Sequence, residues 1–409
     1  CGVYVGSTFI SSTSFALYSN AIGVVLQALF LIFFSALADH GYWRNRYILF
    51  FTILGGLVCS LYSAIPDKYF GLLTIFTIVG NFSSAVASAF YYSYLPIYSS
   101  YNKDTIKAKG REDYYKVRDG ISNKLSANSF SLGMIGAFLV TICASAISLI
   151  MGSSPFALQL AGTLNGIWWL VLGLVSYRYF PKEKQPDLPP NSNLFTFTIS
   201  QLYNSLVSLN NSLDIWLALL SWFFISDGLS TAMYISIFVG RTNLTVTATN
   251  TLFLSAFAPL AEGVGMTLLY YIKNRFQAII STKKMVIFLT ILCTLLTLWG
   301  ILGHYTNVGI KSKGEFYAYY ILLVTFYATL QSFHRVMFAE IVPKGRESEC
   351  FGVYLISYKG TSWIGSLTVG AIVAATNQVR LGYFFVLGLF FAGLVCVFFV
   401  NVNRAQKNA

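Results

Sequence analysis

Two acidic side chains interrupt stretches of the sequence that are otherwise apolar. Asp227 lies in SWFFISDG and Glu262 in PLAEGVG, each near the middle of a long apolar run. A carboxylate in such a position can bind a substrate ammonium group, or it can take up a proton, because burial disfavours its charged form. The adjoining glycines and Pro259 could loosen the helix and free backbone groups for a ligand. Either carboxylate could instead cap a neighbouring helix or form a structural ion pair.

A second group of charges occupies the segment SALADHGYWRNRYIL, residues 35–49, between two apolar runs. Asp39 stands at the end of one run, where an anion can face the positive N-terminus of a neighbouring helix. Arg44 and Arg46 can pair with carboxylates from another part of the chain. We therefore predict a latch that breaks when the protein changes conformation. The alternative is that the two arginines only anchor the topology.

Three further charges, Arg335, Glu340 and Lys359, fall near the ends of apolar runs on the same side. We predict that they form a charge network with Asp39, which would act as a gate. Arg335 could instead hold a substrate carboxylate through a forked pair of hydrogen bonds.

The elements that must position these residues are membrane helices. The chain is 56% hydrophobic and 10% charged, whereas soluble domains carry about 25% charged residues. Its apolar runs are long enough to cross ~30 Å of hydrocarbon as helices, and they lack the alternation of barrel strands. This predicts an all-α polytopic membrane protein, with spans at 12–38, 47–65, 69–97, 125–151, 156–180, 214–239, 246–272, 284–302, 315–341, 350–375 and 379–402.

Charge in the loops predicts the orientation. One set of loops, with the C-terminal tail, carries twenty of the Lys and Arg residues and the opposite set carries five. The positive-inside rule makes the first set, and the C-terminus, cytosolic. The net charge of +12 is then a property of one membrane face, and nucleic acid is not an expected partner.

The predicted spans fall into two groups. Residues 181–213 hold four of the nine prolines and predict a cytosolic linker with an interfacial helix, between helix bundles at 1–180 and 214–409. The chain opens at Cys1 almost inside an apolar run, so we expect a twelfth span upstream. KGRE occurs at 109–112 and at 344–347, which favours an internal duplication of the kind common in transporters over a chance match.

Enzymatic chemistry has little support in the sequence. Three histidines and six cysteines show no HExxH or CxxC spacing, and no GxxxxGK[ST] phosphate loop is present. We therefore expect no catalytic residues, no metal and no cofactor.

The segment that contains Asp39 resembles the signature loop of the major facilitator superfamily, G-x-L-A-D-x-x-G-R-[KR]. The matching positions are Leu37, Ala38, Asp39 and Gly41, and Ser35 replaces the leading glycine. The resemblance implies two helix bundles that work by alternating access.

Longer stretches resemble a narrower group, the autophagy-related protein 22 family of that superfamily. They are residues 13–41, FYYSYLP at 90–96, SWFFISDG at 221–228 and residues 334–366. The resemblance implies a vacuolar membrane protein that exports amino acids, leucine and other neutral ones among them, from the lumen to the cytosol after autophagic degradation. Protons are a candidate coupling ion. A non-transporting sensor or scaffold of the same fold, or a transporter of another small solute, remains the alternative.

Overall fold

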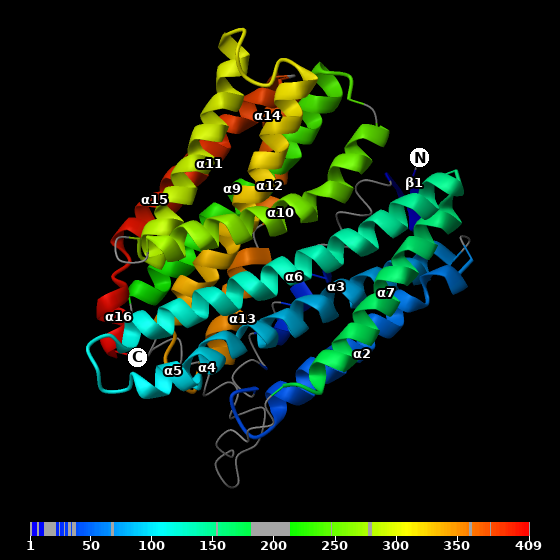
Figure 1. Cartoon of the computed structure of the whole chain (residues 1–409). Coiled ribbons are helices and arrows are strands. Elements are labelled where there is room, and N and C mark those ends of the chain that lie inside the picture. Colours follow the sequence, from blue (N-terminus) through cyan, green and yellow to red (C-terminus); the bar gives the residue numbers. More distant parts are fainter. Residues whose placement is uncertain are drawn as a thin grey trace. The chain divides into compact units, whose positions relative to one another are not determined.

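Long apolar stretches of good helix formers become long helices in the computed structural model of the chain (Figure 1). The structure describes residues 38–66, 69–152, 154–180, 213–246, 248–276, 280–359, 362–376 and 378–408, two strands before them, and scattered positions between 22 and 34. The predicted linker at 181–213 lies almost wholly outside the described residues, and the predicted span at 12–38 is described only at scattered positions.

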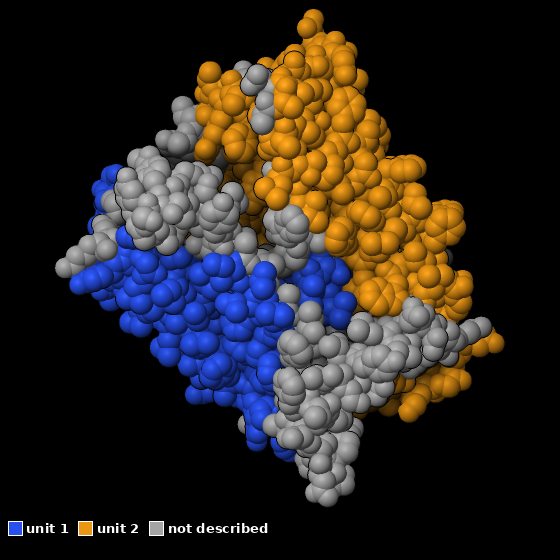
Figure 2. Space-filling model, turned by 180° about the vertical axis from the view of Figure 1, so that it is seen from behind, with its two compact units in different colours: residues 1–92, 143–205, 345–360 blue, residues 93–142, 206–344, 361–409 orange. Residues whose placement is uncertain are grey.

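Two compact units divide the chain, and each is discontinuous in sequence (Figure 2). Unit 1 comprises residues 1–92, 143–205 and 345–360, and unit 2 comprises the remainder, 93–142, 206–344 and 361–409. The division into bundles at 1–180 and 214–409 therefore stays a prediction.

In the part of unit 1 that the structure describes, a short antiparallel hairpin precedes several long helices. Its elements are β1 Gly2–Val5, β2 Thr8–Ser11, α2 Trp43–Ser60, the 3-10 turn η1 Tyr62–Ala64, α3 Phe70–Tyr92, α7 Pro155–Tyr177 and α13 Glu347–Lys359, with the end of α6. Helix α2 packs on α3 and α7, and α13 packs on α3. Glycine makes one of these contacts possible, because a Cβ at Gly166 of α7 would lie 2.3 Å from the Ser60 nitrogen.

Unit 2 is built around α9, which packs against α12, α14 and α15 (Figure 1). Helix α10 packs on α12, and α11 packs on α12 and α15. Its elements are α4 Tyr94–Ser100, α5 Lys103–Lys107, most of α6 Tyr114–Ile150, α9 Leu213–Asn243, α10 Ala248–Arg275, α11 Thr282–Tyr305, α12 Lys313–Ile341, α14 Ser362–Thr376, η3 Val379–Leu381, α15 Gly382–Phe399 and α16 Val402–Asn408.

The prediction of a helical membrane protein is confirmed. Eight helices among the described residues are long and apolar enough to cross a bilayer. The number of spans, eleven in this chain, stays a prediction.

Helix boundaries differ from the predicted spans for local reasons. The span at 69–97 is two helices, because the ring of Pro96 clashes with the carbonyl four residues earlier, at Tyr92, where α3 ends. Helix α6 begins at Tyr114 rather than at 125, since its first turns carry charged residues that hydropathy assigns to a loop. The span at 350–375 is also two helices, of which α13 ends at Lys359 and α14 begins at Ser362.

Candidate functional site

Asp227 lies in the buried middle of α9 and is 1% exposed. Neither carboxylate oxygen has a side-chain hydrogen-bond partner among the described residues, and the Gly365 backbone N–H, near the start of α14, is the donor that faces it; the hydroxyl of Thr231 one turn later has no partner among the described residues. An unpaired carboxylate anion in a dry interior is costly, so such a group requires a proton or a cationic ligand.

The backbone of α14 faces this carboxylate at Gly365. A Cβ added there would lie 1.8 Å from Thr231 Oγ1 and 3.1 Å from Asp227 Oδ1. Only a glycine permits α14 to approach α9 this closely. The sequence therefore folds so that a backbone surface closes over the two polar groups.

Glu262 lies on α10, in a segment held between two other helices of unit 2. The Ser131 hydroxyl of α6 donates to the Gly263 carbonyl at 3.3 Å, and the Thr325 hydroxyl of α12 donates to the Ala261 carbonyl at 3.4 Å. A Cβ at Gly265 would lie 2.1 Å from the Thr325 methyl group. The glycines beside Glu262 thus serve close helix packing.

A buried ion-pair cluster in unit 1 is formed around Arg44, in the first turn of α2. We call Asp39, Arg44, Glu347 and Ser348 the Arg44 cluster. Arg44 is 3% exposed and contacts the Asp39 carboxylate; its Nε donates to Ser348 Oγ at 2.8 Å, and its Nη2 lies 3.6 Å from Glu347 Oε2. Asp39 also accepts the Ser348 backbone N–H at 3.0 Å, so a carboxylate faces the N-terminus of α13.

The surroundings of the Glu347 carboxyl disfavour its charged form. Burial raises its pKa, and the neighbouring Asp39 charge raises it further, while Arg44 opposes the rise. Arg46, which was predicted beside Arg44, is exposed and stacks on the Trp43 ring at 5.3 Å.

A second buried cluster, in unit 2, surrounds Glu340 at the end of α12. We call Arg118, Asp119, Lys273, Thr282 and Glu340 the Glu340 cluster. The Thr282 hydroxyl donates to Glu340 Oε1 at 2.7 Å, and Lys273 Nζ donates to Thr282 Oγ1 at 3.3 Å. Asp119 shares a hydrogen bond with Glu340, and Arg118 Nη2 donates to the carbonyls of Ala339 and Glu340.

The structure thus distributes the predicted gate residues over several places. Asp39 joins Arg44, and Glu340 joins residues of α6, α10 and α11. The Arg335 guanidinium is buried on α12 with its central carbon 6.0 Å from the Phe130 ring centroid. Lys359 is the last residue of α13, and its side chain lies outside what the structure describes.

Sequence reasoning did not find several members of the two clusters. Those missed were Arg118, Asp119, Lys273, Thr282, Glu347 and Ser348. One signal was available, because Glu347 is the final residue of the second KGRE repeat. Lys273 and Asp119 sit among other charges in loop-like sequence, where hydropathy does not separate buried from exposed groups. Within the described ranges, no group of three His, Cys, Asp or Glu side chains could hold a metal ion.

The fold is similar to that of solved membrane transporters. The proton:xylose symporter XylE has a TM-score of 0.66 at 13% identity, covering 95% of this chain and 86% of that one. The transporter FucP in its outward conformation has a TM-score of 0.65 at 11% identity, covering 96% and 91%. The chain therefore has the major facilitator fold.

Sequence comparison narrows the class to one family. The family model described as "Vacuole effluxer Atg22 like" matches residues 1–409, so the chain belongs to that family. Autophagy-related protein 22 of Coccidioides immitis is 24% identical over 459 residues, which span all of this chain and 76% of the relative. The Kluyveromyces lactis protein of the same name is 26% identical over 421 residues, spanning 100% and 83%. The resemblance inferred from the sequence motifs is confirmed.

Proposed function

We propose that this transporter exports neutral amino acids, leucine among them, from the vacuole lumen to the cytosol by alternating access. Membership of the vacuole effluxer family and the major facilitator fold support a transport function. The observation that carries the proposal further is Asp227, a buried carboxylate that faces the Gly365 backbone N–H and has no side-chain partner among the described residues. An amino-acid carrier can use such a group to receive an ammonium or a proton.

Asp227 would work through the contact between α9 and α14. While Gly365 lies against Thr231, the carboxylate is enclosed and stable only when neutral or bound to a cation. A small displacement of α14 from α9 would let solvent reach both polar groups. Loading and release would then alternate with closure of this contact.

The Arg44 cluster would serve as the latch that holds one conformation. The contacts of Arg44 with Ser348 and Glu347 join α2 to the start of α13, which are distant in sequence. We place this end of the protein in the cytosol because the loops beside it carry most of the basic residues.

Replacing Asp227 with Asn tests the proposal, because the amide has nearly the same shape and neither charge nor exchangeable acid proton. We expect leucine efflux from isolated vacuoles to fall to the level of vacuoles that lack the protein, with unchanged protein abundance. Asp104→Asn, on the exposed turn α5, is the matched control and should transport normally.

Repeating the assay with the proton gradient collapsed separates the two roles of Asp227. Loss of wild-type efflux indicates proton coupling, and unchanged efflux indicates ammonium binding. Normal efflux by Asp227→Asn would refute the assigned role. Absence of any leucine flux through the wild-type chain would favour the sensor or scaffold alternative.

A further inference from the structure

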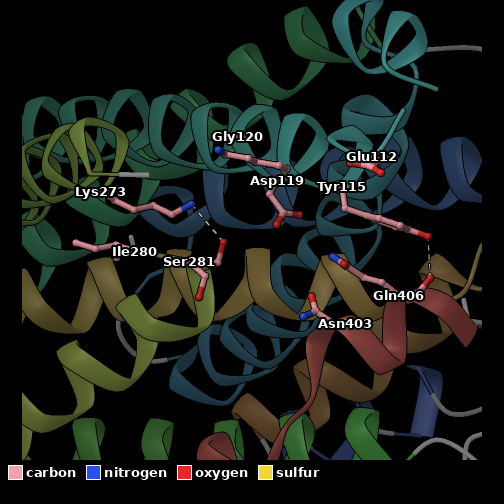
Figure 3. A pocket seen from close by; sticks show the side chains of 11 residues that line it. Glu112, Tyr115, Asp119, Gly120, Lys273, Ile280, Ser281, Asn403 and Gln406 are labelled. Carbon is pink, nitrogen blue, oxygen red and sulfur yellow. Dashed lines mark hydrogen bonds between the residues drawn. The ribbon is translucent and has the colours of Figure 1, made fainter. Parts of the chain in front are cut away.

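A polar pocket opens beside the Glu340 cluster, and none of its lining residues belongs to the site around Asp227. Its volume is about 520 Å³, within the range of small-molecule sites. Residues of α6, α10, α11 and α16 line it, together with Glu112 before α6 and with Ile280 and Ser281 before α11, all of them in unit 2 (Figure 3). Apart from Gly120, the lining has one apolar member, Ile280, so the pocket suits a polar ligand.

The formal charges of the side chains that line the pocket sum to zero. Two acids, Glu112 and Asp119, stand against two bases, Lys116 and Lys273. Figure 3 shows Lys273 on one side of the pocket and Glu112 on the other, with Asp119 between them. A ligand with a net charge would unbalance this set, whereas a dipolar ligand matches it.

The side of the pocket near Lys273 has features that suit an anionic group. Ser281 caps α11 there, and the backbone N–H groups of the first turn of this helix begin at Thr282. The positive end of a helix of this length attracts a carboxylate, and the lysine adds a full charge.

An unpartnered buried group points into the same space from α16. Gln406 is 7% exposed, and its Nε2 has no hydrogen-bond partner among the described residues. Figure 3 shows its amide directed into the pocket, while its backbone carbonyl accepts the Tyr115 hydroxyl at 3.1 Å. Asp119 Oδ1 likewise has no partner among the described residues. The Gln406 amide nitrogen and the Asp119 Oδ1 are therefore available to bind a ligand in the pocket.

We infer that this pocket is a second binding site for a zwitterionic α-amino acid. The ammonium group is bound by Asp119 and Glu112, and the carboxylate by Lys273 and the N-terminus of α11, with the Gln406 amide as an additional donor. An adjoining cavity of about 430 Å³ shares Asp119 and Gln406 and is lined by Glu340 as well, so an occupant would contact the Glu340 cluster directly. That the bound amino acid is the same one that the protein transports rests on the proposed function. The charge pattern of the pocket is independent of that function.

Counting bound leucine tests the inference. The full chain is placed in lipid nanodiscs, where both faces are open, and tritiated leucine is titrated to saturation. We expect two leucine molecules per chain in the wild type and one in Gln406→Leu, whose second site should weaken at least tenfold, about 1.4 kcal/mol. Glu112→Gln, at the exposed mouth, should weaken the same site about threefold. Gln378→Leu, the same substitution at an exposed glutamine outside the pocket, should still bind two.

The Asp227 site serves as an internal control for folding. If Gln406→Leu retains one site that is then lost on adding Asp227→Asn, the variant is folded and the lost site is the pocket. At the pocket, 3-methylbutylamine and 4-methylpentanoate, which lack the carboxylate and the amine of leucine respectively, should not compete.

Three results would overturn the inference: a single site removed by Asp227→Asn alone, two sites in Gln406→Leu, or displacement from the pocket by inorganic phosphate. Failure of the proposed function is distinguishable, because it would remove the Asp227-dependent site and vacuolar efflux and leave the Gln406-dependent site in place.

Discussion

The Arg44 cluster of unit 1 and the Glu340 cluster of unit 2 are assembled from similar parts. Each buries two carboxyl groups with a basic side chain, and each uses a hydroxyl residue at the start of a helix, Ser348 in α13 and Thr282 in α11. In the first cluster the arginine bonds side chains. In the second, Arg118 bonds backbone carbonyls, and Lys273 reaches the Glu340 carboxyl through the Thr282 hydroxyl.

The balance of charge separates the two clusters. In the contacts described for the first, one arginine serves two carboxyl groups, so Glu347 is the member that favours the neutral form. The second has two bases for two acids, and it opens onto a pocket of about 520 Å³. A closed cluster with tight ion pairing suits a latch, and an open, balanced one suits a dipolar ligand.

The largest effect should come from Arg44→Met. It leaves Asp39 and Glu347 buried together without their cation, and removing one partner of a buried ion pair costs about 3–5 kcal/mol. Titration of the purified protein with SDS in mixed micelles should show a loss of this size in the free energy of unfolding. Arg46→Met is the matched control and should change stability by less than about 1 kcal/mol, because Arg46 is exposed and its described contact is with the Trp43 ring.

Lys273→Met should cost less, about 1–3 kcal/mol in the same titration. Lys273 donates to a hydroxyl rather than to a carboxylate, and Asp119 and Glu340 already share a hydrogen bond that a bound proton can maintain. Lys109→Met, in an exposed loop, should be neutral. If Lys273→Met is as destabilising as Arg44→Met, the second cluster is a tight ion pair as well, and the distinction drawn between the two is wrong.

Much of the fold could be predicted from sequence, because a segment that crosses a bilayer must satisfy its backbone hydrogen bonds internally and therefore forms a long apolar helix. The hydropathy of the sequence identifies such segments directly. The pairing of Asp39 with Arg44 was also accessible, since the two lie close together in one loop. The contact of Arg44 with Glu347 was not, because it joins residues that are far apart in the chain and depends on where α13 packs. The burial of Lys273 and Asp119 was hidden for a different reason. Charged side chains beside a membrane span are usually solvated, and only tertiary packing shows that these are enclosed.

The smallest effect, and the sharpest test of the difference in charge balance, is the pH dependence contributed by Glu347. Its pKa in the folded protein is raised above the ordinary value by burial. A carboxyl group of this kind adds stability that is fully present below its unfolded pKa and is lost as the pH rises through its folded pKa. The wild type should therefore lose stability relative to Glu347→Gln as the pH rises from acidic values towards neutral.

Measuring the free energy of unfolding of both proteins across that range checks the sign. The matched comparison is Gln378→Leu, which removes no titratable group from an exposed position, so the wild type and this variant should keep a constant difference in stability. A wild type that gains stability relative to Glu347→Gln as the pH rises would show that Arg44 dominates over burial. In that case Glu347 would be a charged ion-pair partner of Arg44. The two clusters would then no longer differ in whether one carboxyl group favours its neutral form.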